Sequence, residues 1–271
     1  MVLCRRISAY LVLLVTGAAF LSATPGPAGS DTTVIVVLGT VHAPSACFDL
    51  RALSGIIERV NPDLILAELD SSFFTASMTL KPEFTDISME NRAVSLYTQS
   101  HPVPIRPYDI EGRNRTYEQH NYFTLQRELS SALNSAEHDS LLGPRAASLL
   151  DAIRRFDLIG REIGSDRPEV INSNAVDAVM ENKQYYGGEG MAQIVESVPA
   201  LARFADFAEF KRDFWTIRND AMVYNITARV KEFQVRTVLV LCGYEHRYYL
   251  RAALNKRSGA GRFILKEYWA Y

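Results

Sequence analysis

The stretch VIVVLGTVH, from Val34 to His42, decides how the chain is expected to fold. It opens with consecutive aliphatic residues, a pattern typical of a strand buried on both faces of a parallel sheet. The pattern returns near the other end of the chain, where VLVLCGYEH runs from Val238 to His246. In both copies an apolar run precedes a glycine, two further residues and a histidine. Each glycine permits a sharp backbone turn, so we expect each imidazole to lie over the end of its strand.

The chain between these two motifs alternates between strand and helix patterns. A second buried strand is predicted at Leu64–Leu69, and a short strand near a sheet edge at Val103–Arg106, where prolines interrupt the pattern. Apolar spacing predicts helices at Leu50–Val60, Leu141–Ile163, about Phe214–Ala228 and about His246–Asn255, with a flexible turn at Tyr185–Gly190 and a last strand near Phe263. The sequence therefore predicts an α/β fold. It has a mostly parallel sheet, flanking helices and a helical insertion at about 117–213, between the N- and C-terminal βα units.

Composition and charge limit the classes of function. The chain has 271 residues, 48% of them hydrophobic, and a formal net charge of -2, which argues against nucleic-acid binding through a basic face. Arg5 and Arg6 precede an apolar run from Ile7 to Ala23, the pattern of a secretory signal. We expect residues 1–30 to be a signal peptide and linker and 31–271 to be one α/β domain. The protein would be exported to the periplasm or outside the cell, with an uncleaved N-terminal membrane anchor as the alternative.

Three polar side chains are predicted to meet where the buried strands end. His42 and His246 each lie four residues past an apolar run, and Glu68 ends the run LILAE. Ligands of open parallel sheets bind at this edge. Two neutral imidazoles and a carboxylate are a common ligand set for Zn, Mn, Co or Fe. A buried carboxylate needs compensation, so Glu68 is expected either to ligate a metal or to pair with an arginine such as Arg218.

Several other residues have two interpretations each. Arg218 lies one position off the apolar stripe of its helix, so it either orients a carboxylate or stabilises an oxyanion at the site, or it lies at a solvated helix edge. Asp109 and Arg113 are either a pair beside the site or a loop salt bridge. Asp70 is expected to cap a helix or to contact the site. Cys47 and Cys242 either form a disulfide or remain small apolar residues.

In combination, these motifs resemble the Tiki/TraB/PrgY/GumN superfamily. The resemblance rests on Gly39–His42, Glu68–Asp70, Arg218-Asn219 and Gly243–His246, in that order along the chain. It implies a fold related to the erythromycin-esterase and ChaN-like group. Tiki members of the superfamily are metal-dependent proteases, TraB and PrgY members are linked to peptide pheromone shutdown, and many GumN-like members have no assigned reaction. The resemblance also implies that His42, Glu68 and His246 are metal or catalytic residues, with Arg218 in support. Gly243-Tyr244-Glu245-His246 departs from the more usual G-A-G-H.

Three functions are compatible with the predicted site. The first is a metal-dependent hydrolase, peptidase-like, that acts on a peptide or small-molecule substrate with Mn, Co or Zn bound by His42, Glu68 and His246. The second is an esterase-type hydrolase that uses the same histidines and Glu68 as acid and base without a metal. The third is a protein of the cell envelope that binds a peptide or another ligand without turnover. Fold analogy does not choose among them.

Overall fold

The computed structural model describes residues 32–41, 44–261 and 263–271. The predicted signal peptide and linker, residues 1–30, lie outside the described residues, and so does His42. The chain from Thr32 to Tyr271 forms one compact unit. Within the described ranges, no helix combines the length and the apolar character that crossing a bilayer requires.

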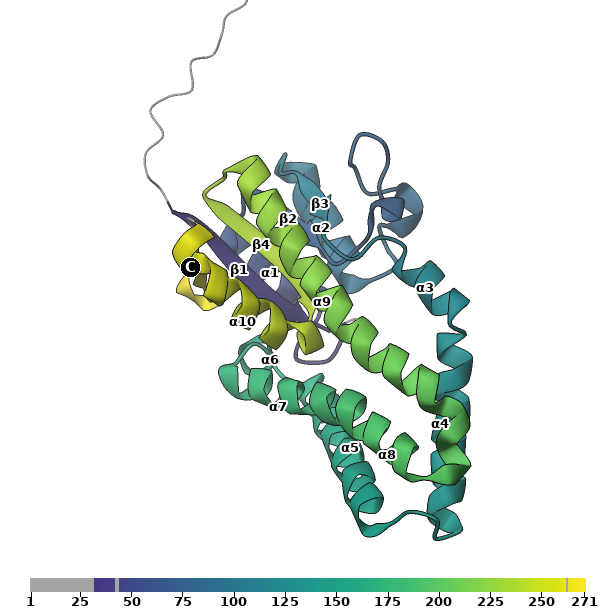
Figure 1. Ribbon diagram of the computed structural model, residues 1–271. Coiled ribbons are helices and arrows are strands. Elements are labelled where there is room, and N and C mark those ends of the chain that lie inside the picture. The colour runs from purple at the N-terminus through teal and green to yellow at the C-terminus, as the bar shows by residue number, and fades with distance from the viewer. Residues whose placement is uncertain (1–31, 42–43, 262) are drawn as a thin grey trace, which may run out of the picture. The chain divides into compact units, whose positions relative to one another are not determined.

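Within the described residues, five strands form one sheet, and all their pairings are parallel. The strands are β1 (Thr33–Thr40), β2 (Leu64–Ala67), β3 (Ile105–Pro107), β4 (Thr237–Gly243) and β5 (Phe263–Lys266). Their order in the sheet is β3-β2-β4-β1-β5, so β4 lies between β1 and β2 although it comes late in the chain (Figure 1). The predicted α/β fold with a parallel sheet is confirmed, and the strand interrupted by prolines is an edge strand.

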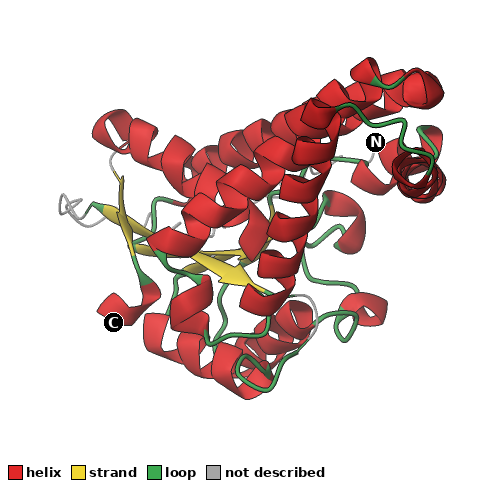
Figure 2. Cartoon of the chain, turned by 90° about the horizontal axis from the view of Figure 1, so that it is seen from below, coloured by secondary structure: helices red, strands yellow, loops and turns green. Residues whose placement is uncertain are grey.

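Helices cover both faces of this sheet (Figure 2). On one face pack α1 (Leu50–Val60) and α2 (Met89–Ser100), and on the other α9 (Ala205–Phe233) and α10 (Tyr244–Gly261). Successive residues of β1 serve the two faces, as the alternation of a strand requires. Val36 shares a core with Ile57 of α1, whereas Val37 shares a core with Ile226 of α9 and Leu250 of α10. The strands are therefore apolar on both sides, as predicted.

Helices fill the chain between β3 and α9. They are α3 (Arg113–Gln119), α4 (Tyr122–His138), α5 (Pro144–Ile163), α6 (Pro168–Ile171), α7 (Asn174–Tyr185), η3 (Tyr186–Gly190), α8 (Met191–Ser197) and η4 (Pro199–Phe204). Three short 3-10 helices lie elsewhere: η1 (Ser71–Phe73), η2 (Pro82–Phe84) and η5 (Tyr268–Ala270). Leu129 of α4, Leu150 of α5, Ile194 of α8 and Phe207 of α9 belong to a third apolar core, separate from the two against the sheet. The long helix α9 runs from this helical cluster along the sheet (Figure 1).

Two features of this helical region differ from the sequence prediction. The glycine-rich segment predicted as a flexible turn forms the π-helix η3, which continues α7 into α8. The predicted end of the insertion, near Asp213, falls inside α9, a single helix of 29 residues. The two halves of α9 pack against different partners, Phe207 in the helical core and Ile226 on the sheet. A single apolar stripe therefore describes only part of α9.

Gly39 has a different role from the predicted turn. Strand β1 continues through Thr40, so the chain does not turn at Gly39. A Cβ atom added to Gly39 would lie 3.0 Å from the Cα of Tyr244 and 3.1 Å from the Cδ of Arg247. The absence of a side chain therefore lets the start of α10 approach β1 closely.

Gly39→Ala should consequently lower the free energy of unfolding by about 1–3 kcal/mol, the usual cost of overpacking a core. Gly55→Ala is the matched control, because nothing lies within 4 Å of a Cβ added to this exposed residue of α1. The control should stabilise the protein by up to about 1 kcal/mol, because alanine has the higher helix propensity. Urea unfolding measures both changes, and equal midpoints for the two variants would contradict the close-approach explanation.

Candidate functional site

The site lies at the carboxyl edge of the sheet, where open parallel sheets bind ligands. Glu68 directly follows β2, Asp109 comes two residues after β3, and His246 lies in the first turn of α10, just after β4. Arg218 and Asn219 reach this edge from the middle of α9. Residues distant in sequence therefore converge because three neighbouring strands end side by side. His42, predicted to join them, lies outside the described residues.

Arg218 is the centre of this cluster. Its Nε and Nη2 donate to the two oxygens of Asp109 at 2.8 and 2.9 Å, and Nη2 also donates to Oε1 of Glu68 at 2.5 Å. Nη1 lies 3.0 Å from Nε2 of His246. Only 7% of the Arg218 side chain is exposed. Burial by itself would lower the pKa of Arg218, but the carboxylates of Glu68 and Asp109 outweigh it and raise that pKa.

Charges are balanced around this arginine. Asp109 also accepts a hydrogen bond from Nη1 of Arg113 at 3.0 Å, so two carboxylates, Glu68 and Asp109, face two guanidinium groups. Oε2 of Glu68 accepts from the backbone N–H of Gly243, the last residue of β4, at 2.6 Å. These bonds compensate the burial of Glu68, of whose side chain 12% is exposed. The pairing of Glu68 with Arg218, one of the two predicted forms of compensation, is present.

His246 is held in one orientation by the helix α9. Asn219 donates its Nδ2 to the carbonyl of Trp215, which leaves its Oδ1 to accept from Nδ1 of His246 at 2.8 Å. We therefore assign the proton of the neutral imidazole to Nδ1 and the lone pair to Nε2. Trp215 stacks on the imidazole with ring centroids 4.3 Å apart and planes 16° from parallel. The Arg218-Asn219 motif thus contacts both nitrogens of one histidine.

Burial keeps His246 uncharged. It lowers the pKa of His246 to about 4, and although the carboxylate of Glu68 acts in the opposite direction, Arg218 adds to the lowering. The imidazole is therefore neutral at pH 7, and its contact with Glu68, 3.6 Å from Nε2 to Oε1, is not an ion pair. A neutral imidazole is the form that binds a metal or accepts a proton, and here its Nε2 lone pair faces Nη1 of Arg218.

A cavity of about 350 Å³ borders Glu68. Its wall includes Thr40 at the end of β1, Arg113 of α3 and the apolar side chains of Phe74 and Ile87. A second cavity, of about 810 Å³, lies among the helices of the insertion, and Trp215 and Glu245 form part of its wall. Glu68 thus borders one space that can admit small molecules, and Trp215, which stacks on His246, borders the other.

The remaining predicted residues have these places in the structure. Asp70 caps η1, accepting a hydrogen bond from the backbone of Ser72. Asp109 pairs with Arg113, and both lie in the cluster rather than in a remote loop. Cys47 is exposed, Cys242 is buried, and both are free thiols. Trp215 was not predicted at all, because a tryptophan on an amphipathic helix gives no signal that separates a ring over a histidine from a core residue.

The cluster offers two ligand atoms to a divalent ion. Oε1 of Glu68 and Nε2 of His246 are 3.6 Å apart, compatible with one ion about 2.1 Å from each. Among the described residues no group of three or more His, Cys, Asp or Glu side chains could hold a metal. The two described ligands fit a shared ion, although Arg218 is hydrogen-bonded to both atoms and would have to release them.

No family model matches the chain, and no solved structure matches it. The superfamily resemblance therefore rests on the four motifs, of which three contribute described residues to this cluster: Glu68, Arg218 with Asn219, and Gly243 with His246.

Proposed function

We propose that this chain is a metal-dependent hydrolase, peptidase-like, in which Glu68 and His246 bind a divalent ion such as Mn, Co or Zn. The observation that carries the proposal is the 3.6 Å separation of Glu68 Oε1 from Nε2 of a neutral histidine, at the ligand-binding edge of the sheet. The resemblance to Tiki and TraB proteins supports the same chemistry. His42 is the proposed third ligand.

The groups around these two ligands support that role. Asn219 fixes the Nδ1–H of His246, and the backbone of Gly243 fixes one oxygen of Glu68. Such outer contacts orient metal ligands and set their protonation. When bound, a divalent ion lowers the pKa of its water and polarises a substrate carbonyl. The Nη groups of Arg218 contact both proposed ligands, and on release from them they can donate to an oxygen that becomes negative in the reaction.

A second candidate is a hydrolase of the same site without a metal. The observation in its favour is Arg218, whose positive charge already lies against both Glu68 and His246. In this reaction class, Arg218 supplies the electrostatic stabilisation and the neutral His246 acts as the base. The two candidates differ in whether the folded protein retains a metal.

The test is to treat the purified chain with a chelator, dialyse it against trace Mn, Co and Zn, and measure bound metal and hydrolysis of a peptide library. We expect about one ion per chain in the wild type. Glu68→Gln and His246→Ala should lose the ion and lower kcat/KM at least about 100-fold, beyond the 10- to 100-fold usual for an outer contact. His138→Ala, an exposed histidine at the end of α4, is the matched control.

Each outcome of this test has a definite meaning. A metal-free wild type that still hydrolyses peptides would move the assignment to the second candidate. A folded wild type with neither metal nor hydrolysis would refute both hydrolase proposals and leave ligand binding. Circular dichroism of each variant separates loss of a ligand from loss of the fold.

A further inference from the structure

The larger cavity contains a cation, Lys211, that has no partner among the described residues. This cavity, of about 810 Å³, is open to solvent on one side and is lined by residues of α3, α4, α5, α7, η3, α8, α9 and the start of α10. Its walls carry four cationic side chains: Arg154, Lys183, Lys211 and Arg212. Three of them are paired. Arg154 bonds Glu137, Lys183 bonds both Asp157 and Glu245, and Arg212 lies against Glu189 and Asp213.

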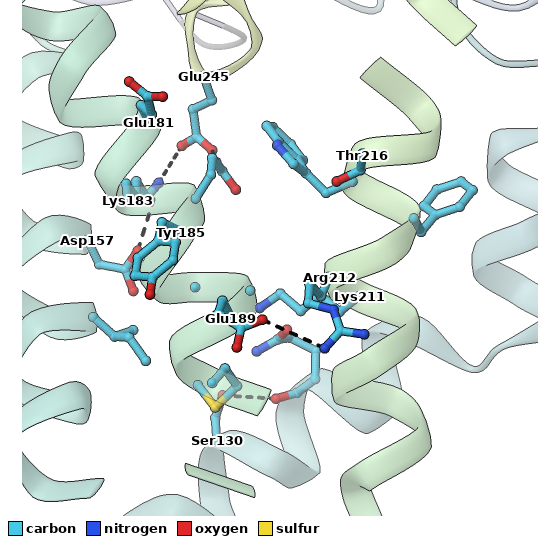
Figure 3. Close-up of a pocket in the computed structure, with 18 of the residues that line it drawn as sticks. Ser130, Asp157, Glu181, Lys183, Tyr185, Glu189, Lys211, Arg212, Thr216 and Glu245 are labelled. Atoms are coloured by element: carbon cyan, nitrogen blue, oxygen red, sulfur yellow. Dashed lines mark hydrogen bonds and ion pairs between the residues drawn. The ribbon is translucent and has the colours of Figure 1, made fainter. Parts of the chain in front are cut away.

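Lys211 is the fourth cation (Figure 3). No described residue accepts a hydrogen bond from its ammonium group or forms an ion pair with it. Burial lowers the pKa of Lys211 below its ordinary 10.5, and the carboxylates of Asp157 and Glu245 offset this only in part. A partly desolvated ammonium without a partner costs stability, and an anion from a ligand would remove that cost.

A second polar group in the same cavity is also unsatisfied. The side-chain oxygen of Gln126, on α4, is buried and accepts no hydrogen bond from the part of the chain that the structure describes. The cavity thus offers an ammonium donor and an amide acceptor, which match a carboxylate and an N–H of one ligand. Aromatic side chains form much of the remaining wall and suit the apolar parts of a peptide: Tyr117, Tyr122, Tyr185, Phe214, Trp215, Tyr248 and Tyr249.

The helix α9 connects this cavity to the candidate site. Lys211, Trp215 and Arg218 follow one another at steps of four and three, so they share one face of the helix. Trp215 lines the cavity and also stacks on His246, and Glu245 of the cavity wall directly precedes that histidine. Seven residues of helix separate Lys211 from Arg218 by about 10 Å, which is the length of roughly three extended peptide residues.

We propose that this cavity binds the carboxylate-bearing end of a peptide substrate, with Lys211 as the residue that pairs with the carboxylate. The assignment of the ligand as a substrate rests on the proposed hydrolase function. Lys211 is a specificity-determining residue in this proposal, and it takes no part in the chemistry at Glu68 and His246. The carboxylate is either a free C-terminus or an acidic side chain, and the test separates these two sources.

The test is to measure the equilibrium binding of three peptides to the full chain. The fluorescence of Trp215 reports the binding. Trp269, the other tryptophan of the chain, is replaced by Phe so that Trp215 is the sole reporter. The probes are acetyl-Ala-Ala-Phe-Ala as the free acid, the same peptide as the C-terminal amide, and acetyl-Ala-Ala-Phe-Glu amide. Variants are Lys211→Gln, Lys211→Arg and, as the matched control, Lys231→Gln, an exposed lysine of the same helix.

We expect the free acid to bind at least 10-fold more tightly than the amide, and Lys211→Gln to abolish this preference. Lys211→Arg and Lys231→Gln should retain it. Tight binding of the glutamate peptide would identify an acidic side chain as a source, whereas binding as weak as that of the alanine amide would restrict recognition to the free C-terminus. Lys211→Gln removes an unpaired charge, so its melting temperature should not fall below that of the wild type.

Equal binding of acid and amide, no binding of any peptide at millimolar concentration, or an unchanged preference in Lys211→Gln would overturn the proposal. Failure of the hydrolase proposal has a different signature. In that case the acid preference and its dependence on Lys211 remain, and no peptide is cleaved. If the protein cleaves the free-acid peptide and the KM of Lys211→Gln equals that of the wild type, the hydrolase proposal is supported and the proposed role of Lys211 is wrong.

Discussion

Arg218→Met should lower the free energy of unfolding by about 3–5 kcal/mol, the cost of removing one partner from a buried ion pair. Asp109, of whose side chain 1% is exposed, loses both of its bonds to this arginine, and Glu68 loses one. Methionine replaces the apolar stem of the arginine, so the loss reports mainly on the charge. Chemical denaturation with the midpoint and slope fitted separately measures this change.

A control on the same helix separates burial from the loss of an arginine. Arg229 pairs with Glu232 within α9, and both side chains are partly exposed, 31% and 52%. Arg229→Met should therefore cost no more than about 0.5 kcal/mol, as exposed helix pairs do. If the two variants have similar stabilities, the cluster at the sheet edge does not contribute to folding in the way we describe.

A double variant identifies the source of the loss. Glu68→Gln removes one of the two carboxylates that Arg218 neutralises, so Arg218→Met should cost less in that background, by about 0.5–3 kcal/mol. Asp109 and Arg113 remain paired in both backgrounds. Strict additivity of the two single changes would show that Glu68 and Arg218 do not interact energetically.

Local patterns made the sheet and the place of the site predictable. The runs at Val34–Leu38 and Leu64–Ala67 are apolar at every position because both faces of β1 and β2 are covered by helices. A carboxylate that ends such a run needs a partner, and this reasoning already named Arg218 for Glu68. That ion pair, one of the two alternatives expected for Glu68, is present at 2.5 Å. The carboxyl ends of parallel strands meet at one edge, which predicts that Glu68 and His246 are close.

Contacts between side chains that are distant in the sequence were not predictable, because they produce no periodic spacing of residues along the chain. Asn219 was known only as part of a motif, and nothing local indicates that its amide holds Nδ1 of a histidine 27 residues later. Lys211 has no sequence signal either, since a lysine at a helix position is normally solvated. Lys211 has no described partner because the nearby carboxylates pair with other cations: Asp157 and Glu245 with Lys183, and Glu189 with Arg212. Such features follow from the assembled helices and not from any single segment.

Arg247 is another residue that sequence analysis did not identify, and its replacement should have the second largest effect on stability. Its side chain is fully buried. Nη1 donates to Asp177 of α7 and Nη2 to Glu267 after β5, both at 2.7 Å, and Nε donates to the carbonyl of Val37 in β1 at 3.3 Å. This one guanidinium therefore joins the helical insertion to the sheet.

Arg247→Met should lower the free energy of unfolding by about 3 kcal/mol, at the lower end of the range for buried pairs because Asp177 and Glu267 are 13% and 21% exposed. Arg251→Met is a closely matched control. Arg251 lies one turn further along α10 and contacts the same two carboxylates at 2.7 and 2.6 Å, but 26% of its side chain is exposed. Its loss should cost no more than about 1 kcal/mol.

Hydrogen exchange gives a second readout of the same change. Because Arg247 ties α7 to β1, the amides of α7 should exchange faster in Arg247→Met, whereas those of α1, which packs on the opposite face of the sheet, should change only as far as global stability does. In Arg251→Met, α7 should remain protected. If Arg247→Met and Arg251→Met lower the free energy of unfolding equally, the pairing with Asp177 and Glu267 accounts for the stabilisation. The burial of Arg247 and its bond to β1 would then contribute nothing measurable.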